Sequence, residues 1–373
     1  MSDKITIVHI VSLLNRGGVE VWLLNLLNNF DRDKYEFVFI AVKRGKGDLD
    51  DQIRSLGGKI VTCPLDVGYR KFSKEFKKIL LQVNAQVVHT HLLFFSGLIC
   101  KLAKKVGIPS RIVHIHNTND GHSLSMKRKL YHWLMKKRIH KYCTSGLAVS
   151  AMAADYGFMK NWRKYSKYQI LPCGIDTRKF TEIKDRAELC KEFGLPLDSI
   201  VVGHVGSFRM QKNHTYLIRV AAEMIKKNPK VVFLLIGEGP LQKEIRKTVY
   251  DLKLEKNILF AGARNDVPTL MKNLFDIFIF PSLYEGLGVV VIEAQCAGVP
   301  CLISKSIPPE VCVLDNQVFM ESIDEEPRIW ADKAMTILSQ SRINSETSLA
   351  TIQQSLFSID SNILTLSGLY SSI

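Results

Sequence analysis

The sequence predicts an α/β protein built from two doubly wound domains, and three observations lead to this class. The chain has 373 residues, more than one compact core usually holds. Short apolar strand segments alternate with amphipathic helical segments along its length. This alternation restarts near residue 170, where an apolar run is followed by a Pro/Gly break. A parallel sheet covered by helices on both faces has this pattern, and here it occurs twice.

The elements follow in order along each half. Strands are expected at residues 5–12, 35–42, 59–65 and 86–91, with helices at 18–30, 48–57 and 72–83. In the second half, strands are expected at 199–206, 231–237, 257–262 and 275–282, with helices at 214–228, 240–252 and 266–273. We therefore predict an N-terminal domain over 1–172 and a C-terminal domain over 173–349. The tail, about 350–373, is expected as a helix returning to the first domain or as a loose end.

The composition limits the partners and the compartment. A net charge of +15 favours anionic partners, namely nucleotides, nucleic acid or an acidic membrane surface. No apolar run approaches the roughly 20 residues needed to span a bilayer, and the N-terminus enters a strand directly, so no signal peptide is expected. The eight cysteines show no C-x-x-C spacing, which favours reduced thiols in a cytoplasmic protein over disulfides or a zinc site.

Ligands of open α/β sheets bind at the carboxyl ends of strands, so ligand-binding residues are expected directly after the strands. Gly17 and Gly18 follow the first strand and open a helix, where a backbone can approach an anion closely. Taken alone, this short motif is better explained as a tight strand-to-helix turn. The segment is not G-x-G-x-x-G and gives little support to a dinucleotide-dependent dehydrogenase.

The second half carries two cations after its first strand. Arg209 and Lys212 follow Gly206 and together can clamp a diphosphate, although a solvated basic loop is the alternative. The next two loops contain Gly237 and the pair Gly262 and Ala263. Such loops can hold a nucleobase through backbone groups, or they are simple turns.

Two carboxylates, Glu285 and Glu293, flank the glycine-rich run Gly286, Leu287 and Gly288 ahead of a predicted helix. The backbone amides of this run are expected to point at an anion. A glycosidase-like acid and base pair is conceivable. An anion-binding loop between the carboxylates fits a phosphorylated leaving group better, since positive charge stabilises such a group without a proton donor.

Two H-x-H pairs end strands of the first half, His89 with His91 and His114 with His116. Residues two apart in a strand share a face, so a metal site was considered. No Asp, Glu or Cys lies at ligand spacing, and no metal is expected. We expect one histidine to line the cleft and its partner to be buried and hydrogen-bonded.

A segment without acidic residues, 122–150, combines cations with aromatic and aliphatic side chains. A basic amphipathic helix of this kind is typical of membrane-surface elements, with about 1 kcal/mol for each cation near an anionic surface. A solvated helix face is the alternative, and RNA binding is less favoured because no RNA-binding motif accompanies the charge. The predicted membrane contacts are Lys127, Arg128, Lys129, Lys136, Lys137 and Arg138.

In combination these motifs resemble glycosyltransferase family 4. They are S-x-x-E-G-x-G-x-x-x-x-E-A-x-x-x-G-x-P at 282–300, G-S-F-x-x-Q-K-N-H at 206–214, C-G-I-D-x-x-x-F at 173–180 and G-G-x-E at 17–20. The likeness covers roughly residues 5–310, and "HIHNT" and "SKSIPPEV" resemble the bacterial exopolysaccharide and capsule branch. The resemblance implies the GT-B fold, with two Rossmann-like domains facing across a cleft. It also implies a retaining enzyme that binds the acceptor in the N-terminal domain and the nucleotide sugar in the C-terminal one.

The resemblance also implies roles for single residues. Arg209 and Lys212 would neutralise the donor diphosphate, Glu293 would bind the ribose, and Glu285 would contact the transferred sugar. The amides of residues 286–288 would touch phosphate and sugar. His116 would face the sugar, Gly17 and Gly18 would close on the donor, and no metal would be needed. This chain departs from the family at Cys173, where Asn is usual, and at Leu287, where Phe is frequent.

The resulting expectation is a retaining hexosyltransferase of surface polysaccharide synthesis. It would use a nucleotide diphosphate sugar, most readily UDP-linked, and a lipid-linked saccharide acceptor, without metal or other cofactor. It would be cytoplasmic, peripheral at the inner face of the membrane, and would bind no nucleic acid. The alternatives are a nucleotide-sugar epimerase or hydrolase on the same fold, or a basic nucleic-acid- or membrane-binding module without catalysis.

Overall fold

The computed structural model describes residues 4–121, 123, 125–340 and 344–372. The chain divides into two compact units. Unit 1 comprises Met1–Gly174 with Ile359–Ile373, and unit 2 comprises Ile175–Ser358. The sequence placed the boundary between residues 172 and 173, and the start of the tail near residue 350. Among the described helices, none is both long and apolar enough to cross a membrane.

Unit 1 is built on a seven-stranded sheet in the order β3-β2-β1-β4-β5-β6-β7, and its strand pairs are parallel. The chain starts in the middle of the sheet, builds outward to β3 and then crosses to β4 on the other side of β1. This reversal lies between β1 and β4. The strands are β1 (Ile5–Val11), β2 (Tyr35–Ala41), β3 (Lys59–Thr62), β4 (Val87–Thr90), β5 (Ser110–Ile115), β6 (Ser145–Ala148) and β7 (Tyr168–Ile170).

Helices cover both faces of this sheet. They are α1 (Gly18–Asn29), α2 (Asp50–Ser55), α3 (Tyr69–Gln82), α4 (Ser96–Lys105), α5 (Met126–Tyr142), α6 (Ala151–Gly157) and α14 (Ile359–Ser371), with short 3-10 turns η1 (Leu65–Val67), η2 (Leu93–Phe95) and η3 (Trp162–Lys164). One face carries Val8 and Ile10 of β1, which share a core with Phe72 and Phe76 of α3. Alternation along β1 turns His9 to the opposite face.

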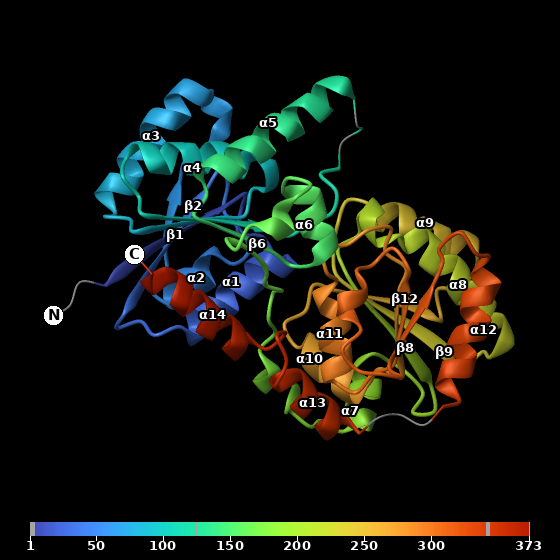
Figure 1. Ribbon diagram of the computed structural model, residues 1–373. Helices are drawn as coiled ribbons and strands as arrows, with labels where there is room; N and C mark the ends of the chain where they lie inside the picture. Colours follow the sequence, from blue (N-terminus) through green and yellow to red (C-terminus); the bar gives the residue numbers. More distant parts are fainter. Residues whose placement is uncertain (1–3, 122, 124, 341–343, 373) are drawn as a thin grey trace. The chain divides into compact units, whose positions relative to one another are not determined.

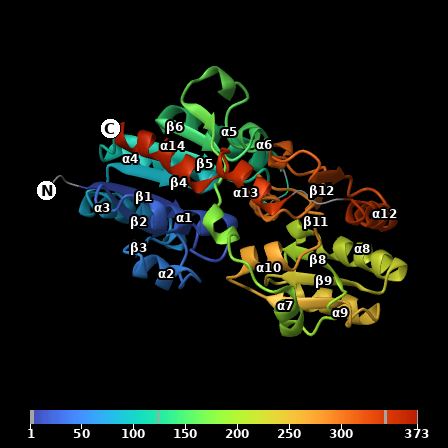
Figure 2. The same cartoon turned by 90° about the horizontal axis from the view of Figure 1, so that it is seen from below.

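The C-terminal helix α14 belongs to unit 1 and covers part of that opposite face. Figures 1 and 2 show α14, in red, among the blue and green elements of unit 1. The indole Nε1 of Trp22 in α1 donates to Asn362 Oδ1 of α14 over 2.8 Å, and both side chains are buried. Tyr370 of α14 is also fully buried, with its hydroxyl 2.8 Å from His89 Nδ1. The tail was expected either as a helix returning to the first domain or as a loose end, and α14 is such a returning helix.

Unit 2 repeats the design with six parallel strands in the order β10-β9-β8-β11-β12-β13. The strands are β8 (Ile200–Val205), β9 (Val231–Ile236), β10 (Ile258–Gly262), β11 (Ile277–Phe280), β12 (Cys301–Ser304) and β13 (Val318–Glu321). The helices are α7 (Arg186–Glu192), α8 (His214–Lys227), α9 (Gln242–Asp251), α10 (Val267–Asn273), α11 (Val289–Cys296), α12 (Pro327–Leu338) and α13 (Ser345–Gln353), with 3-10 turns η4 (Thr177–Phe180), η5 (Met210–Lys212) and η6 (Pro309–Val311).

The core of unit 2 explains why its strand segments read as continuous apolar runs. All six residues of β9 are buried, because α8, α9 and α12 contribute buried apolar side chains to the core cluster that includes β9. A parallel strand covered on both faces has no polar side to alternate with. The order of strands reverses between β8 and β11, and a reversal of this kind opens a ligand crevice at the carboxyl ends. The predicted class, two doubly wound α/β domains, is confirmed.

Candidate active site

The loops after β8 and β11 meet at the point of reversal in unit 2. Lys212, in η5 after β8, places its Nζ 2.6 Å from Oε1 of Glu285, which follows β11. Gln211 donates to the other carboxylate oxygen of Glu285 over 3.1 Å and to the carbonyl of Tyr284 over 3.0 Å. The side chains of Lys212 and Glu285 are only 16% and 9% exposed to solvent, so this ion pair is largely desolvated.

The position of Lys212 depends on the glycine before it in the loop. A Cβ on Gly206 would lie 3.1 Å from Cγ of Lys212, tighter than ordinary packing allows, so a side chain there would displace the lysine. The ammonium group also sits 4.6 Å from the ring centre of Phe280, the last residue of β11. The backbone amide of Leu283 donates to the carbonyl of Gln211 over 2.8 Å and ties the two loops together.

Arg209 lies in the same loop but is arranged differently. It precedes η5 with an extended backbone and is exposed. No ion pair holds its guanidinium in the part of the chain that the structure describes. The two predicted cations therefore differ. Lys212 already forms an ion pair with Glu285, whereas the charge of Arg209 is available to a ligand. A net positive charge remains at this edge, which suits an anion.

The neighbouring loops, which contain Gly237, Gly262 and Ala263, are joined through their backbones. The amide of Gly237 donates to the carbonyl of Gly262 over 2.8 Å, and the amide of Gly206 donates to the carbonyl of Ile236 over 2.9 Å. Gly237 has φ +134°, and a Cβ there would lie 2.2 Å from the carbonyl oxygen of Gly206. Only glycine fits this position, because the β8 and β9 loops approach each other at backbone distance.

The glycine-rich run ends where α11 begins. Gly288 has φ +93° and precedes Val289, the first residue of the helix. Leu287 is buried, at 3% exposure, so the residue that replaces the family's frequent Phe still fills an apolar position. Gly286 and Gly288 are buried as well. Glu285 precedes the run, and Glu293 lies in the second turn of α11, so the two carboxylates occupy different environments.

Glu293 as a whole residue is partly exposed, but its carboxyl group is buried. This burial raises the pKa of the carboxyl to about 7, and the positive charge of nearby Lys179 offsets part of the rise. The unfolded chain would ionise this group near its usual value of 4.5. The folded state therefore holds the proton more tightly and loses stability as pH rises through 7.

From this we predict that Glu293→Gln raises the free energy of unfolding at pH 8 by about 3 kcal/mol, since the pKa rises from 4.5 to about 7 and one pKa unit is worth about 1.4 kcal/mol. The difference should vanish at pH 4, where the wild-type carboxyl is protonated in both states. Urea unfolding at the two pH values measures it. An equal effect of the substitution at pH 4 and pH 8 would show that the pKa is not raised.

In unit 1, Gly17 and Gly18 lie at the start of α1, directly after β1. A Cβ on Gly17 would lie 2.6 Å from Oε2 of Glu20, so the glutamate side chain rests against this glycine. A Cβ on Gly18 would meet nothing within 4 Å. The end of a flexible glutamate side chain can move aside, so neither Gly17 nor Gly18 shows a steric need for glycine within unit 1.

His116 directly follows β5 and is held at both ring nitrogens. Its Nε2 lies 2.8 Å from Nδ1 of His91, and its Nδ1 lies 3.4 Å from Sγ of Cys173. Cys173, the residue that departs from the family pattern, is therefore the partner of the predicted sugar-facing histidine. In each H-x-H pair the first histidine is fully buried and the second, His91 or His116, is partly exposed.

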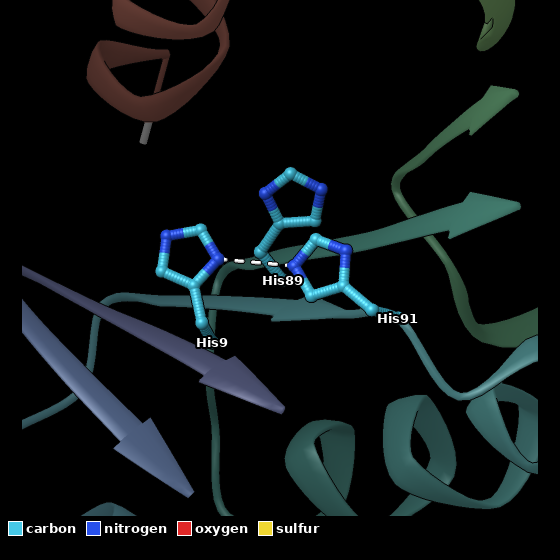
Figure 3. Close-up of side chains that lie close together, drawn as sticks. All are labelled: His9, His89 and His91. Atoms are coloured by element: carbon cyan, nitrogen blue, oxygen red, sulfur yellow. Dashed lines mark hydrogen bonds between the residues drawn. The ribbon is translucent and has the colours of Figure 1, made fainter. Parts of the chain in front are cut away.

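The sequence analysis missed His9, which stands alone in β1 and belongs to no pair. Its Nδ1 lies 3.1 Å from Nε2 of His91, and β1 and β4 place it level with His89 (Figure 3). Five histidines therefore gather at the ends of three adjacent strands. The argument against ligands, which looked only at nearby sequence, did not account for this clustering across strands.

The basic segment forms α5, but its six predicted membrane contacts do not share one environment. Lys127, Lys129 and Lys137 are exposed. Arg128 pairs with buried Asp120 at 2.5 Å, Lys136 reaches the carbonyl of Asp155, and Arg138 lies against the sulfur of Met135, so these three are partly buried. The large apolar side chains exposed on α5 are Met126, Leu130, Trp133 and Leu134.

A pocket of about 420 Å³ opens at the point of reversal in the sheet of unit 1. It combines apolar side chains with cations. Arg44 pairs with Asp66 at 2.9 Å, and Lys43 is exposed beside them. The lining consists of Ser12, Val42, Lys43, Arg44, Leu65, Asp66, Leu92 and Phe95. No sequence motif indicates this pocket, because its residues come from four separate strand ends.

Comparison with known proteins identifies the family to which this chain belongs. Residues 16–179 match the model of the family described as Glycosyltransferase Family 4, and residues 185–348 match Glycosyl transferases group 1. The Bacillus subtilis protein EpsF, named as a glycosyltransferase, is 30% identical over 99% of this chain and 97% of its own length. The chain belongs to glycosyltransferase family 4. It is an enzyme that transfers sugar.

Other relatives and structures agree with this membership. The Escherichia coli UDP-Gal:alpha-D-GlcNAc-diphosphoundecaprenol alpha-1,3-galactosyltransferase is 27% identical over 91% of both chains. The Staphylococcus aureus capsular polysaccharide biosynthesis glycosyltransferase CapH is 29% identical over 91% of this chain and 92% of its own. Anabaena HepE in complex with UDP has a TM-score of 0.79 over 100% of both chains at 17% identity. This family 4 glycosyltransferase has the GT-B fold, as predicted.

Proposed function

We propose that this enzyme is a retaining hexosyltransferase that moves a hexose from a UDP-sugar to a lipid-linked saccharide in bacterial surface polysaccharide synthesis. The observation that carries the donor assignment is the charge arrangement at the reversal in unit 2. There, the exposed Arg209 adds a free cation to the ion pair of Lys212 and Glu285. The relatives support the pathway, since EpsF and CapH are named as glycosyltransferases and CapH acts in capsular polysaccharide synthesis.

The donor diphosphate is proposed to bind Arg209 and Lys212. Arginine offers a planar fork and lysine a point charge, and both suit phosphate oxygens. When the diphosphate arrives, Lys212 can share its ammonium between phosphate and Glu285, because a lysine has three donors. The amides of residues 286–288 would complete the anion site, and Glu293 would accept from the ribose hydroxyls. The UDP-bound structure of HepE supports a uridine donor.

Retention follows if the acceptor hydroxyl attacks from the face that the diphosphate leaves. The departing phosphate oxygen then takes the hydroxyl proton, and no side chain has to act as a base. Arg209 and Lys212 stabilise the charge that develops on the leaving group, which is the work a metal ion does in other transferases. Glu285, beside them, would lie against the transferred sugar. In unit 1, Gly17, Gly18 and His116 are assigned to the donor and its sugar on the family resemblance.

The acceptor is proposed to bind unit 1. Its pocket joins apolar side chains such as Phe95 to the ammonium group of Lys43, a combination that suits a phosphorylated lipid carrier and its first sugar. The name of the Escherichia coli relative includes a diphosphoundecaprenol acceptor, which supports this class. We accordingly place the enzyme at the inner face of the cytoplasmic membrane, as a peripheral protein without nucleic-acid partners.

The helix α5 is the proposed membrane contact, through exposed apolar side chains as well as cations. We predict that Leu130→Glu weakens sedimentation with anionic phosphatidylglycerol vesicles at least tenfold, because it removes a leucine worth roughly 1.5–3 kcal/mol when buried and adds a repelled charge. The matched control is Leu364→Glu on α14, where the leucine is 78% exposed. Equal loss in both variants, or none in Leu130→Glu, would contradict this contact.

The donor assignment is tested by thermal unfolding of the full chain with UDP, GDP and ADP, each alone and as a hexose conjugate. A bound nucleotide raises the unfolding temperature by mass action. We expect UDP and UDP-hexoses to raise it and the other bases to have little effect. The epimerase and hydrolase alternatives are separated by omitting the acceptor, since an epimerase converts its nucleotide sugar alone. Absence of any nucleotide effect would overturn the donor site.

A further inference from the structure

Four of the five clustered histidines of unit 1, namely His9, His89, His91 and His114, have no role in the proposed donor chemistry. His9 and His89 are level on the adjacent strands β1 and β4, and His91 follows β4 on the same face. Figure 3 shows the three imidazoles gathered at the ends of these strands. One ring nitrogen from each lies within 4.8 Å of the other two.

Several nitrogens of this cluster are buried without a partner among the described atoms. They are His9 Nε2, His89 Nε2 and His114 Nδ1. All three side chains are 0% exposed. His114 shows the chemical state most clearly, because its Nε2 lies 2.9 Å from the carbonyl oxygen of Leu171, which can only accept. Its Nδ1 is therefore an unprotonated lone pair in a dry interior. Buried polar atoms without a partner are rare and usually indicate an ion or an ordered water.

An unprotonated imidazole nitrogen is the form that binds zinc and related divalent ions. We propose that His9, His89 and His91 bind one divalent transition-metal ion of the zinc class. Zinc–nitrogen bonds of 2.0–2.1 Å in a tetrahedral site place nitrogens roughly 3.3–3.4 Å apart. The distance from His9 Nδ1 to His91 Nε2 is already 3.1 Å. This trio is preferred to His91, His114 and His116, because the 3.1 Å between His9 Nδ1 and His91 Nε2 is nearer to the zinc geometry than the 2.8 Å between His91 Nδ1 and His116 Nε2.

Neighbouring residues provide hydrogen bonds to the ring nitrogens that would not bind the ion. Metal-bound histidines usually hydrogen-bond through their other nitrogen. His91 Nδ1 lies 2.8 Å from His116 Nε2, and His89 Nδ1 lies 2.8 Å from the Tyr370 hydroxyl. His91 is partly exposed and offers a way in for the ion. A bound ion would tie β1 to β4, at the reversal of the sheet, and α14 would help to hold it through Tyr370. It would take no part in the step at the diphosphate.

The test uses the full chain without a histidine tag, stripped with EDTA and dialysed. Titration with ZnCl₂ by calorimetry, and with CoCl₂ by visible absorbance, should give one equivalent per chain and the visible bands of four-coordinate cobalt. The unfolding temperature of the stripped protein should rise with zinc. His89→Gln and His91→Gln should each weaken zinc binding at least 100-fold. His140→Gln, which alters a histidine of α5, is the matched control and should bind as the wild type does.

Absence of a saturable equivalent in the wild-type chain would overturn the proposal and leave the cluster as a network of hydrogen-bonded neutral imidazoles. Zinc binding that survives both His89→Gln and His91→Gln would overturn it as well. If either variant fails to fold, the cobalt spectrum and the zinc-dependent unfolding temperature of the wild type decide. None of these readouts depends on sugar transfer.

Discussion

Glu285→Gln is expected to reduce sugar transfer by about 10²–10³-fold, the loss typical when one electrostatic contact to a developing charge is removed. It should also lower the free energy of unfolding by about 3–5 kcal/mol, because it leaves the ammonium of Lys212 without its counter-charge while only 16% of that side chain is exposed. Initial rates with saturating donor and acceptor measure the first effect, and urea unfolding measures the second.

The double variant Lys212→Met with Glu285→Gln separates the two effects. It removes the stranded charge, so it should regain at least half of the lost stability, while transfer stays lost because the diphosphate has lost a cation. A coupling of about 2 kcal/mol or more between the two sites is expected from the stabilities of the four proteins. Near-normal turnover of Glu285→Gln, or additive stabilities, would show that this ion pair is not the centre of the donor site.

Arg209→Ala should have the second large effect and should act on rate alone. Its guanidinium is exposed, and no ion pair within the described chain depends on it, so stability should change by no more than about 0.5 kcal/mol. Transfer should fall about 100-fold or more, because the leaving diphosphate would lose the forked donor that we propose for it. Steady-state kinetics in low-salt buffer measure this.

The matched control for that variant is Arg219→Ala, which removes an exposed arginine from α8 and alters the net charge equally. It should leave both rate and stability unchanged. A loss of transfer in Arg219→Ala equal to that in Arg209→Ala would assign the effect to overall charge instead of to a contact with the donor.

The loops at the carboxyl ends of the strands in unit 2 could be predicted from the sequence, because a strand end is visible as the end of an apolar run. Glycines and charged residues placed there are then brought to one edge by a parallel sheet. The pairing of Lys212 with Glu285 could not be predicted, since these residues lie 73 positions apart and either could have faced a ligand alone. Only the approach of the β8 and β11 loops makes them partners.

The histidines show a second limit. The pairs His89/His91 and His114/His116 were visible, but His9 carried no local signal. Its place beside His89 depends on β1 pairing with β4 across the reversal of the sheet. The helix α5 shows a third limit. Its cations were visible in the sequence, but Arg128 is already matched by Asp120, which a charge count along the helix does not show.

The most direct test of the central claim is the configuration of the product. The full-length enzyme would be incubated with a UDP-hexose and a polyprenyl-diphosphate-linked saccharide, and the new anomeric centre would be assigned by proton NMR. We predict one added hexose per acceptor, one UDP released per transfer, and the anomeric configuration of the donor. An inverted centre, or conversion of the UDP-hexose that does not require the acceptor, would contradict the account.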